Sequence, residues 1–234
     1  LSTKNLLSCL KKTKKKWVIL ITGGEPFVYP NFVNICKQLT KHYKIAINTN
    51  LSDNSILNDF IRSINPDMVE YFYVSTHIEE REKRDDLEKF IKRISLLKKS
   101  GFKVKVNYVI HPSLMNRLEK DYAFFKTHGI KLLIIPFGGN HKKKVYPEAY
   151  TKSERKFILK YNPSALFDRD LFQGLKCNAG RTYVRVDEKG IVTRCYTDKT
   201  VLGSILKGIT LYEEAKMCKE KICRCYGKFL IEKE

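Results

Sequence analysis

The chain has 234 residues, of which 43% are hydrophobic, and this composition builds a packed domain and excludes an intrinsically disordered protein. No apolar run approaches the roughly 20 residues that cross a bilayer, and no signal peptide is visible, so we expect a cytoplasmic protein with no membrane partner. The net charge of +20 suits a polyanion, but it comes from 34 Lys spread along the chain against 11 Arg, which disfavours a nucleic-acid partner without excluding it.

Apolar runs alternate with helix-like stretches in the first two thirds of the chain. The runs that predict strands are 17–22, 44–49, 71–76, 104–110 and 131–137. Between them, residues 31–42 and 87–101 carry apolar side chains at helical spacing, and Gly101 is a good helix end. A strand and a helix that alternate in this way predict parallel pairing with right-handed crossovers.

Polar residues and glycines follow these runs at their carboxyl ends. They are Thr22 to Glu25, Asn48 to Asn50, Ser75 to His77, Asn107 with His111, and Gly138 with Gly139. In α/β barrels the loops at this rim surround a ligand cavity, so five polar ends in succession favour a site there. The alternative is that strands end in turn residues in any case.

The pattern changes after residue 140. We expect a connecting loop, a helix near 151–161, and then a hairpin that turns at Gly190, with a short helix over 209–218. The last 58 residues have little core of their own, and domains this small often need a metal. The predicted domains are 1–165 and 166–234.

Five of the seven cysteines fall in this last section, and in a cytosolic chain such clustering favours metal binding over disulfides. The candidate ligands are Cys177, Cys195, Cys218, Cys223 and Cys225. Cys223 and Cys225 are two residues apart, roughly 6.6 Å on extended backbone, which suits an iron–sulfur cluster better than a tight zinc tetrahedron. We favour Cys177, Cys195, Cys223 and Cys225 as ligands, with Cys218 as the rival, and zinc remains open. Cys9 lies in an apolar helical context typical of a buried thiol.

The turn Gly23-Gly24-Glu25-Pro26 ends the first strand. Glycine lets the backbone approach a ligand closely and adopt positive φ, so its carbonyls can face a donor such as an ammonium group. Glu25 adds a carboxylate, and Pro26 ends the strand. The turn therefore predicts a site for a positively charged amine.

This turn, GGEP, resembles the motif of the radical S-adenosylmethionine (SAM) enzymes. The resemblance implies an α/β fold: a partial (βα)6 TIM-like barrel lacking its first strand, with a small cysteine-rich β-hairpin extension. It implies that Gly23, Gly24 and Glu25 hold the amino group of SAM. Further SAM contacts are implied at the next strand ends, at Asn48, Asn50, Ser75 and His77, and then at Asn107. The other histidines, His42, His111, His128 and His141, are assigned no role.

The segment 177–195, with its hairpin glycine and flanking cysteines, resembles the auxiliary-cluster extension called SPASM, or twitch when shortened. The resemblance implies one auxiliary [4Fe-4S] cluster. The CxxxCxxC motif that binds the SAM-cleaving cluster is absent from the given sequence, since only Cys9 precedes Gly23. A truncated record and a degenerate copy would both explain this.

The implied activity is that of an oxidoreductase in which a 5′-deoxyadenosyl radical abstracts hydrogen from a substrate, a peptide, a protein or a small molecule. An electron donor such as flavodoxin or ferredoxin is the implied partner. Two alternatives stay open: a catalytically degenerate protein that binds SAM or a peptide, and a zinc-stabilised RNA-binding protein.

Overall fold

The computed structural model describes residues 2–52, 55–165, 167, 173–220 and 223. Its contacts divide the chain into one unit of residues Trp17–Phe167 and another that joins Leu1–Lys16 to Asp168–Glu234. Each unit is considered by itself. Within the described part, no helix has the length and apolar character needed to cross a bilayer.

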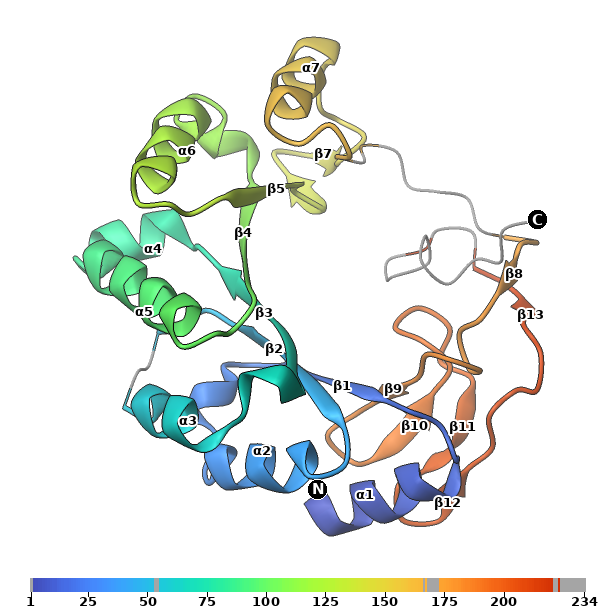
Figure 1. The fold of residues 1–234 in the computed structure, drawn as a ribbon. Coiled ribbons are helices and arrows are strands. Elements are labelled where there is room, and N and C mark those ends of the chain that lie inside the picture. The colour runs from blue at the N-terminus through green and yellow to red at the C-terminus, as the bar shows by residue number, and fades with distance from the viewer. Residues whose placement is uncertain (1, 53–54, 166, 168–172, 221–222, 224–234) are drawn as a thin grey trace. The chain divides into compact units, whose positions relative to one another are not determined.

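The Trp17–Phe167 unit is built on a parallel sheet of five strands in the order β1-β2-β3-β4-β5 (Figure 1). The strands are β1 (Val18–Ile21), β2 (Lys44–Thr49), β3 (Val69–Ser75), β4 (Val104–Ile110) and β5 (Leu132–Pro136). All four neighbouring pairs are parallel. The predicted α/β fold with a parallel sheet is confirmed, and each predicted strand lies within about two residues of an observed one.

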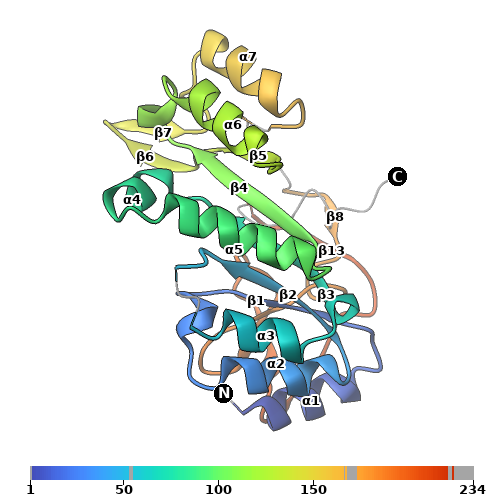
Figure 2. The same ribbon diagram turned by 60° about the vertical axis from the view of Figure 1, so that its left-hand side comes forward.

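Helices cover one face of this sheet (Figures 1 and 2). They are α2 (Phe32–Thr40), α3 (Leu57–Ser63), α4 (Ile78–Lys83), α5 (Leu87–Lys99) and α6 (Leu118–Thr127), with 3-10 turns η1 (Pro26–Val28), η2 (Pro66–Met68) and η3 (Pro112–Leu114). The core between sheet and helices is rich in phenylalanine, including Phe27, Phe60 and Phe72, whose rings pack 5.6–6.4 Å apart. Because successive strand residues point to opposite faces, the neighbours of Phe72 point away from the helices.

The end of this unit is more regular than the sequence predicted. Where a connecting loop was expected from about residue 140, the structure has a small hairpin, β6 (Gly139–His141) paired with β7 (Lys144–Tyr146). Strands of three residues are too short to give an alternating pattern. The predicted helix near 151–161 is confirmed as α7 (Lys152–Tyr161), which begins with a capping box between Thr151 and Glu154.

The other unit joins the first helix to the tail of the chain. Helix α1 (Thr3–Lys12) places Cys9 in a core with Val192, Leu202 and Ile205. The strands form an antiparallel sheet in the order β12-β11-β10-β9 and a separate pair, β13-β8. They are β8 (Lys176–Cys177), β9 (Arg185–Val186), β10 (Ile191–Thr193), β11 (Val201–Ser204), β12 (Gly208–Ile209) and β13 (Lys216–Met217). The sequence did not indicate that residues 1–16 pack with the tail.

The short helix expected over 209–218 is wrong. The structure has no helix there; Ile209 ends β12, and Lys216 and Met217 form β13, which pairs antiparallel with β8. Tertiary pairing with Lys176 and Cys177 supplies the backbone hydrogen bonds that a local helix would otherwise make.

Candidate functional site

The first component of the site is the turn after β1. Gly23 and Gly24 have φ values of +104° and +54°, a region that side chains rarely adopt, which explains glycine at both positions. Both glycines are exposed, and no heavy atom lies within 4 Å of the place where a Cβ would stand. The backbone here is therefore open to a ligand at close range.

The carboxylate of Glu25 ties the end of β1 to the end of β2. Its Oε1 accepts hydrogen bonds from the Thr49 hydroxyl at 2.5 Å and from the Phe27 backbone N–H at 3.2 Å, and its Oε2 accepts from the Asn50 backbone N–H at 2.7 Å. Glu25 also caps the 3-10 turn η1. A carboxylate has about four acceptor sites, so these three bonds leave room for one more donor.

A second brace joins β2 to β3 through Arg81, which is 4% exposed. Its Nε donates to the Thr76 carbonyl at 2.6 Å, its Nη2 donates to the Asn50 carbonyl, and its Nη1 donates to Asp86 at 2.6 Å. Its guanidinium carbon also lies 3.5 Å from the centroid of the Phe90 ring. Asn50 is thus fixed from both sides, by Glu25 at its N–H and by Arg81 at its carbonyl.

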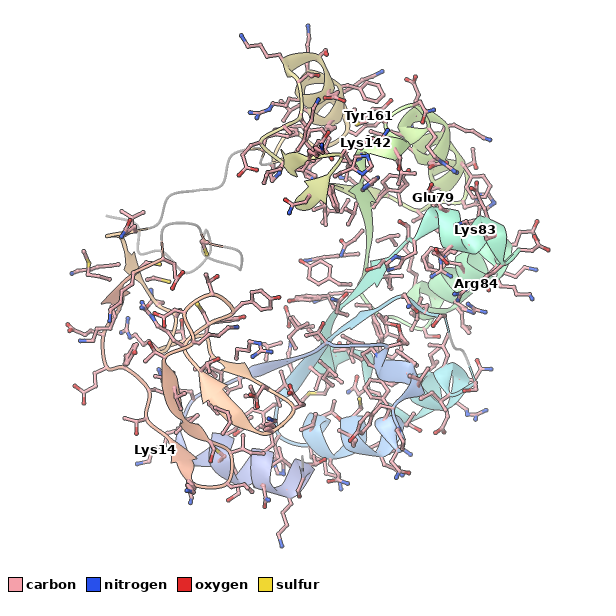
Figure 3. All side chains as sticks on the ribbon, turned by 180° about the vertical axis from the view of Figure 1, so that it is seen from behind. Lys14, Glu79, Lys83, Arg84, Lys142 and Tyr161 are labelled. Carbon is pink, nitrogen blue, oxygen red and sulfur yellow. The ribbon has the colours of Figure 1, made fainter. Side chains whose placement is uncertain are left out.

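Sequence reasoning missed this second brace. Arg93, 8% exposed, extends it by donating to the Leu51 carbonyl at 2.7 Å and pairing with Asp86 at 3.1 Å. Arg81 stands in a run of charged residues that predicts a solvated helix face, and Lys83 and Arg84 of that run do lie at the outer side of the helix layer (Figure 3). Only the position of Arg81 within α4, one turn after the buried Ile78, distinguishes it from these exposed neighbours.

The other predicted SAM contacts lie along the same edge of the sheet. Asn48 is half-buried, and its amide donates to the Thr22 hydroxyl at 3.2 Å. Ser75 ends β3 and stands directly opposite Asn107 of β4. His77 follows with φ +44° at the start of α4, where burial and the charge of Arg81 lower the pKa of its imidazole.

Two histidines with no predicted role also meet at this edge. His111, which follows β4, and His141 of β6 have ring centroids 4.5 Å apart, and the Phe137 ring lies 4.7 Å from His111. The His111 Nδ1 accepts from the Ser113 backbone N–H at 3.2 Å. The pairing depends on the β6–β7 hairpin, which the sequence did not predict.

The described cysteines of the tail come together in the other unit. Cys177 and Cys195 are buried around Ala179, Cys218 packs against them, and burial raises the pKa of the Cys218 thiol. Backbone N–H groups of Ala179 and Asp198 donate to the sulfurs of Cys177 and Cys195, at 3.5 and 3.1 Å. Cys225 lies outside the described residues. Among the residues that are described, no three His, Cys, Asp or Glu side chains are placed to hold a single metal ion.

Arg194 links the three segments that carry these thiols. It is 3% exposed, and its guanidinium donates to the Ala179 carbonyl at 3.2 Å, to Asp198 at 2.8 Å and to the carbonyls of Lys216 and Met217 at 2.8 and 3.2 Å. Burial raises the pKa of the Cys177 thiol, while the Ala179 N–H and Arg194 oppose that rise. A buried cation beside several thiols is what a site for thiolates needs.

Comparison with known proteins gives the family. Residues 3–125, just over half of the chain, match the model of the radical SAM superfamily. The chain belongs to the radical SAM superfamily. A GTP 3′,8-cyclase from Synechocystis sp. is 25% identical over 169 residues, which cover 63% of this chain and 50% of that enzyme. The chain therefore spans about half the length of this curated relative.

Solved structures share the fold of this radical SAM chain. Native anSMEcpe with bound AdoMet and Kp18Cys peptide has a TM-score of 0.62 at 16% identity, over 91% of this chain and 71% of that one. SuiB from Streptococcus suis, bound to precursor peptide SuiA, has a TM-score of 0.57 at 15% identity, over 83% and 53%. At these identities the likeness shows the fold alone, which fits a partial TIM-like barrel.

The superfamily implies SAM and a [4Fe-4S] cluster, and the residues present fit SAM. The turn at Gly23 and Gly24 offers open backbone, and Glu25 has room for one more donor. The described thiols of the tail do not form a complete metal site by themselves, but they are gathered, receive N–H donors and lie beside a buried guanidinium.

Proposed function

We propose that this chain is part of a radical SAM enzyme that modifies a peptide. The proposal rests chiefly on the superfamily match, which includes the Gly23–Glu25 turn and strands β1 to β4. When bound, SAM and its reducing cluster supply a 5′-deoxyadenosyl radical that abstracts hydrogen from the substrate. The peptide is proposed because anSMEcpe and SuiB were solved with peptides bound. The proposed electron donor is a flavodoxin or ferredoxin, and the proposed location is the cytoplasm.

The chain's own residues bind and orient the cofactor in this proposal. Backbone carbonyls of Gly23 and Gly24 accept hydrogen bonds from the SAM ammonium, and the free acceptor site of Glu25 balances its charge. The bonds from Thr49 and Asn50 hold that carboxylate in one orientation, so little entropy is lost on binding. The remaining proposed contacts are Asn48, Asn50, Ser75 and His77.

The tail is proposed to hold one auxiliary [4Fe-4S] cluster, as in a SPASM or twitch extension. Cys177, Cys195 and Cys218 are three proposed ligands, and Cys223 or Cys225 is the fourth. This differs from the set favoured by sequence alone, because Cys218 packs against Cys177 and Cys195. The division into a barrel of 1–165 and an extension of 166–234 stays a prediction.

The deciding experiment uses the full-length gene product, reconstituted anaerobically with iron and sulfide. We expect 5′-deoxyadenosine when SAM and a reductant are added, and iron in excess of one cluster per chain. Replacing Cys177 with Ala should remove the iron of one cluster and leave 5′-deoxyadenosine formation without substrate measurable. A colourless protein that binds zinc, or an iron-loaded protein that never cleaves SAM, would contradict the proposal.

A further inference from the structure

One face of the parallel sheet carries an aromatic and cationic patch beside the proposed SAM contacts, and the patch includes Asn107, which the sequence resemblance places among those contacts. Phe72 and Val74 are fully buried on the helix side, so Tyr71, Tyr73 and Ser75 point to the opposite face. The strand register places Lys105 beside Tyr73, and Asn107 beside Ser75. The patch is therefore continuous along β3 and β4, and it reaches the proposed SAM contact Ser75, which stands beside Asn107.

The ammonium of Lys105 lies over two aromatic rings. Its Nζ is 4.6 Å from the centroid of Tyr71 and 5.3 Å from that of Tyr73, and the two rings are 4.6 Å apart. Lys105 is exposed, and none of the ion pairs between described residues includes it. The rings hold the cation in place without neutralising it, so the patch retains a positive charge.

Asn107 adds an unpaired hydrogen-bond acceptor to the patch. Its side-chain oxygen is buried and finds no hydrogen-bond partner among the described residues. A buried acceptor without a donor is costly, so a ligand that brings an N–H to this oxygen would bind more tightly. Lys105 and Asn107 are two residues apart on one strand face, roughly 6.6 Å, and an extended peptide repeats at the same interval.

We propose that Tyr71, Tyr73, Lys105 and Asn107 bind the substrate and select a peptide with a carboxylate side chain next to the residue that is modified. The carboxylate pairs with Lys105, a backbone N–H donates to Asn107, and apolar atoms rest on the tyrosine rings. A nucleotide is the less suitable occupant, because a polyphosphate needs several cations and this patch supplies one. The inference deepens the proposed function and rests on its peptide substrate.

The test is a selection from a random peptide library on the full-length, SAM-loaded protein. We expect Asp or Glu to be enriched at one position with the wild type, and this preference to disappear with Lys105→Gln and return with Lys105→Arg. The selected peptide should bind about tenfold more weakly to Lys105→Gln. Lys92→Gln is the matched control, since Lys92 is an exposed lysine on α5.

Three outcomes would overturn the inference. They are no enriched peptide, an enriched peptide without an acidic position, and an acidic preference that Lys105→Gln leaves unchanged. GTP, measured by equilibrium dialysis as a second probe, should not compete with the selected peptide. Formation of 5′-deoxyadenosine is assayed separately, so a protein that selects acidic peptides without cleaving SAM would refute the proposed function and leave this inference standing.

Discussion

At the scale of single residues, the proposed SAM site depends on side chains that are held by hydrogen bonds to other residues of the same chain. Glu25 illustrates this, because the same carboxylate that is proposed to meet SAM also joins two strand ends. We expect Glu25→Gln to weaken SAM binding about tenfold and to cost about 1 kcal/mol of unfolding free energy, since the new amide cannot accept from both Thr49 and Asn50. Calorimetry and thermal unfolding measure the two effects.

Glu70→Gln is the control for this variant. Glu70 lies on β3 and is partly exposed, and its bond to Lys44 at 3.3 Å is a surface ion pair that contributes little. The control should bind SAM like the wild type. Tight SAM binding by Glu25→Gln would show that the carboxylate is only a structural brace.

Arg194 gives the corresponding prediction in the tail unit. Replacing it with Met removes its bonds to three segments and leaves Asp198 buried without its cation, which costs about 3 kcal/mol or more. Arg194→Lys keeps the positive charge but loses the branched guanidinium, so the stability of this variant should fall between those of the wild type and Arg194→Met. Iron content and thermal unfolding are the measurements, with the half-buried Arg185→Met as control. An Arg194→Met protein that melts like the wild type would contradict this role.

At the scale of elements, the sequence predicted the strands of the repeating strand–helix pattern. It missed the short strands and the contacts between residues that are far apart in the chain. Five apolar runs became five strands, since each strand buries the apolar side chains of at least one of its faces. The short strands β6, β7 and β13 carry no such signal. Likewise, the Gly23–Glu25 turn is visible in sequence, whereas the contact between Arg81 and Asn50 joins residues 31 positions apart and leaves no local trace.

Helix α7 shows an element whose start the sequence does encode. The Thr151 side chain accepts from the Glu154 backbone N–H, and the Glu154 carboxylate accepts from the Thr151 N–H at 2.7 Å. Thr151→Ala should therefore cost about 1 kcal/mol of unfolding free energy, visible as a lower melting temperature. Lys152→Ala, one residue into the helix, should leave stability nearly unchanged, and equal losses in the two variants would argue against the cap.

At the scale of the whole molecule, the two units differ in what stabilises them. The Trp17–Phe167 unit has a large apolar core with several fully buried phenylalanines, whereas the tail unit combines α1 with short strands and a group of thiols. If the tail unit holds the metal proposed for it, removal of that metal should lower its folding free energy. Each unit also contains a buried cysteine that reports on its own unfolding: Cys9 in the tail unit and Cys36 in the sheet unit.

The thiols of Cys9 and Cys36 allow the proposed dependence of the tail unit on metal to be tested within one molecule. Burial raises the pKa of Cys9, and it raises that of Cys36 to about 12, so neither thiol should react with iodoacetamide at pH 8 while its unit is folded. After iron is removed with a chelator, we expect mass spectrometry to find Cys9 alkylated and Cys36 unmodified, although Cys9 precedes β1 of the sheet unit by only a few residues. Cys177→Ala should expose Cys9 without any chelator. Labelling of both cysteines would mean that the units unfold together, and labelling of neither would mean that the tail holds its fold without metal.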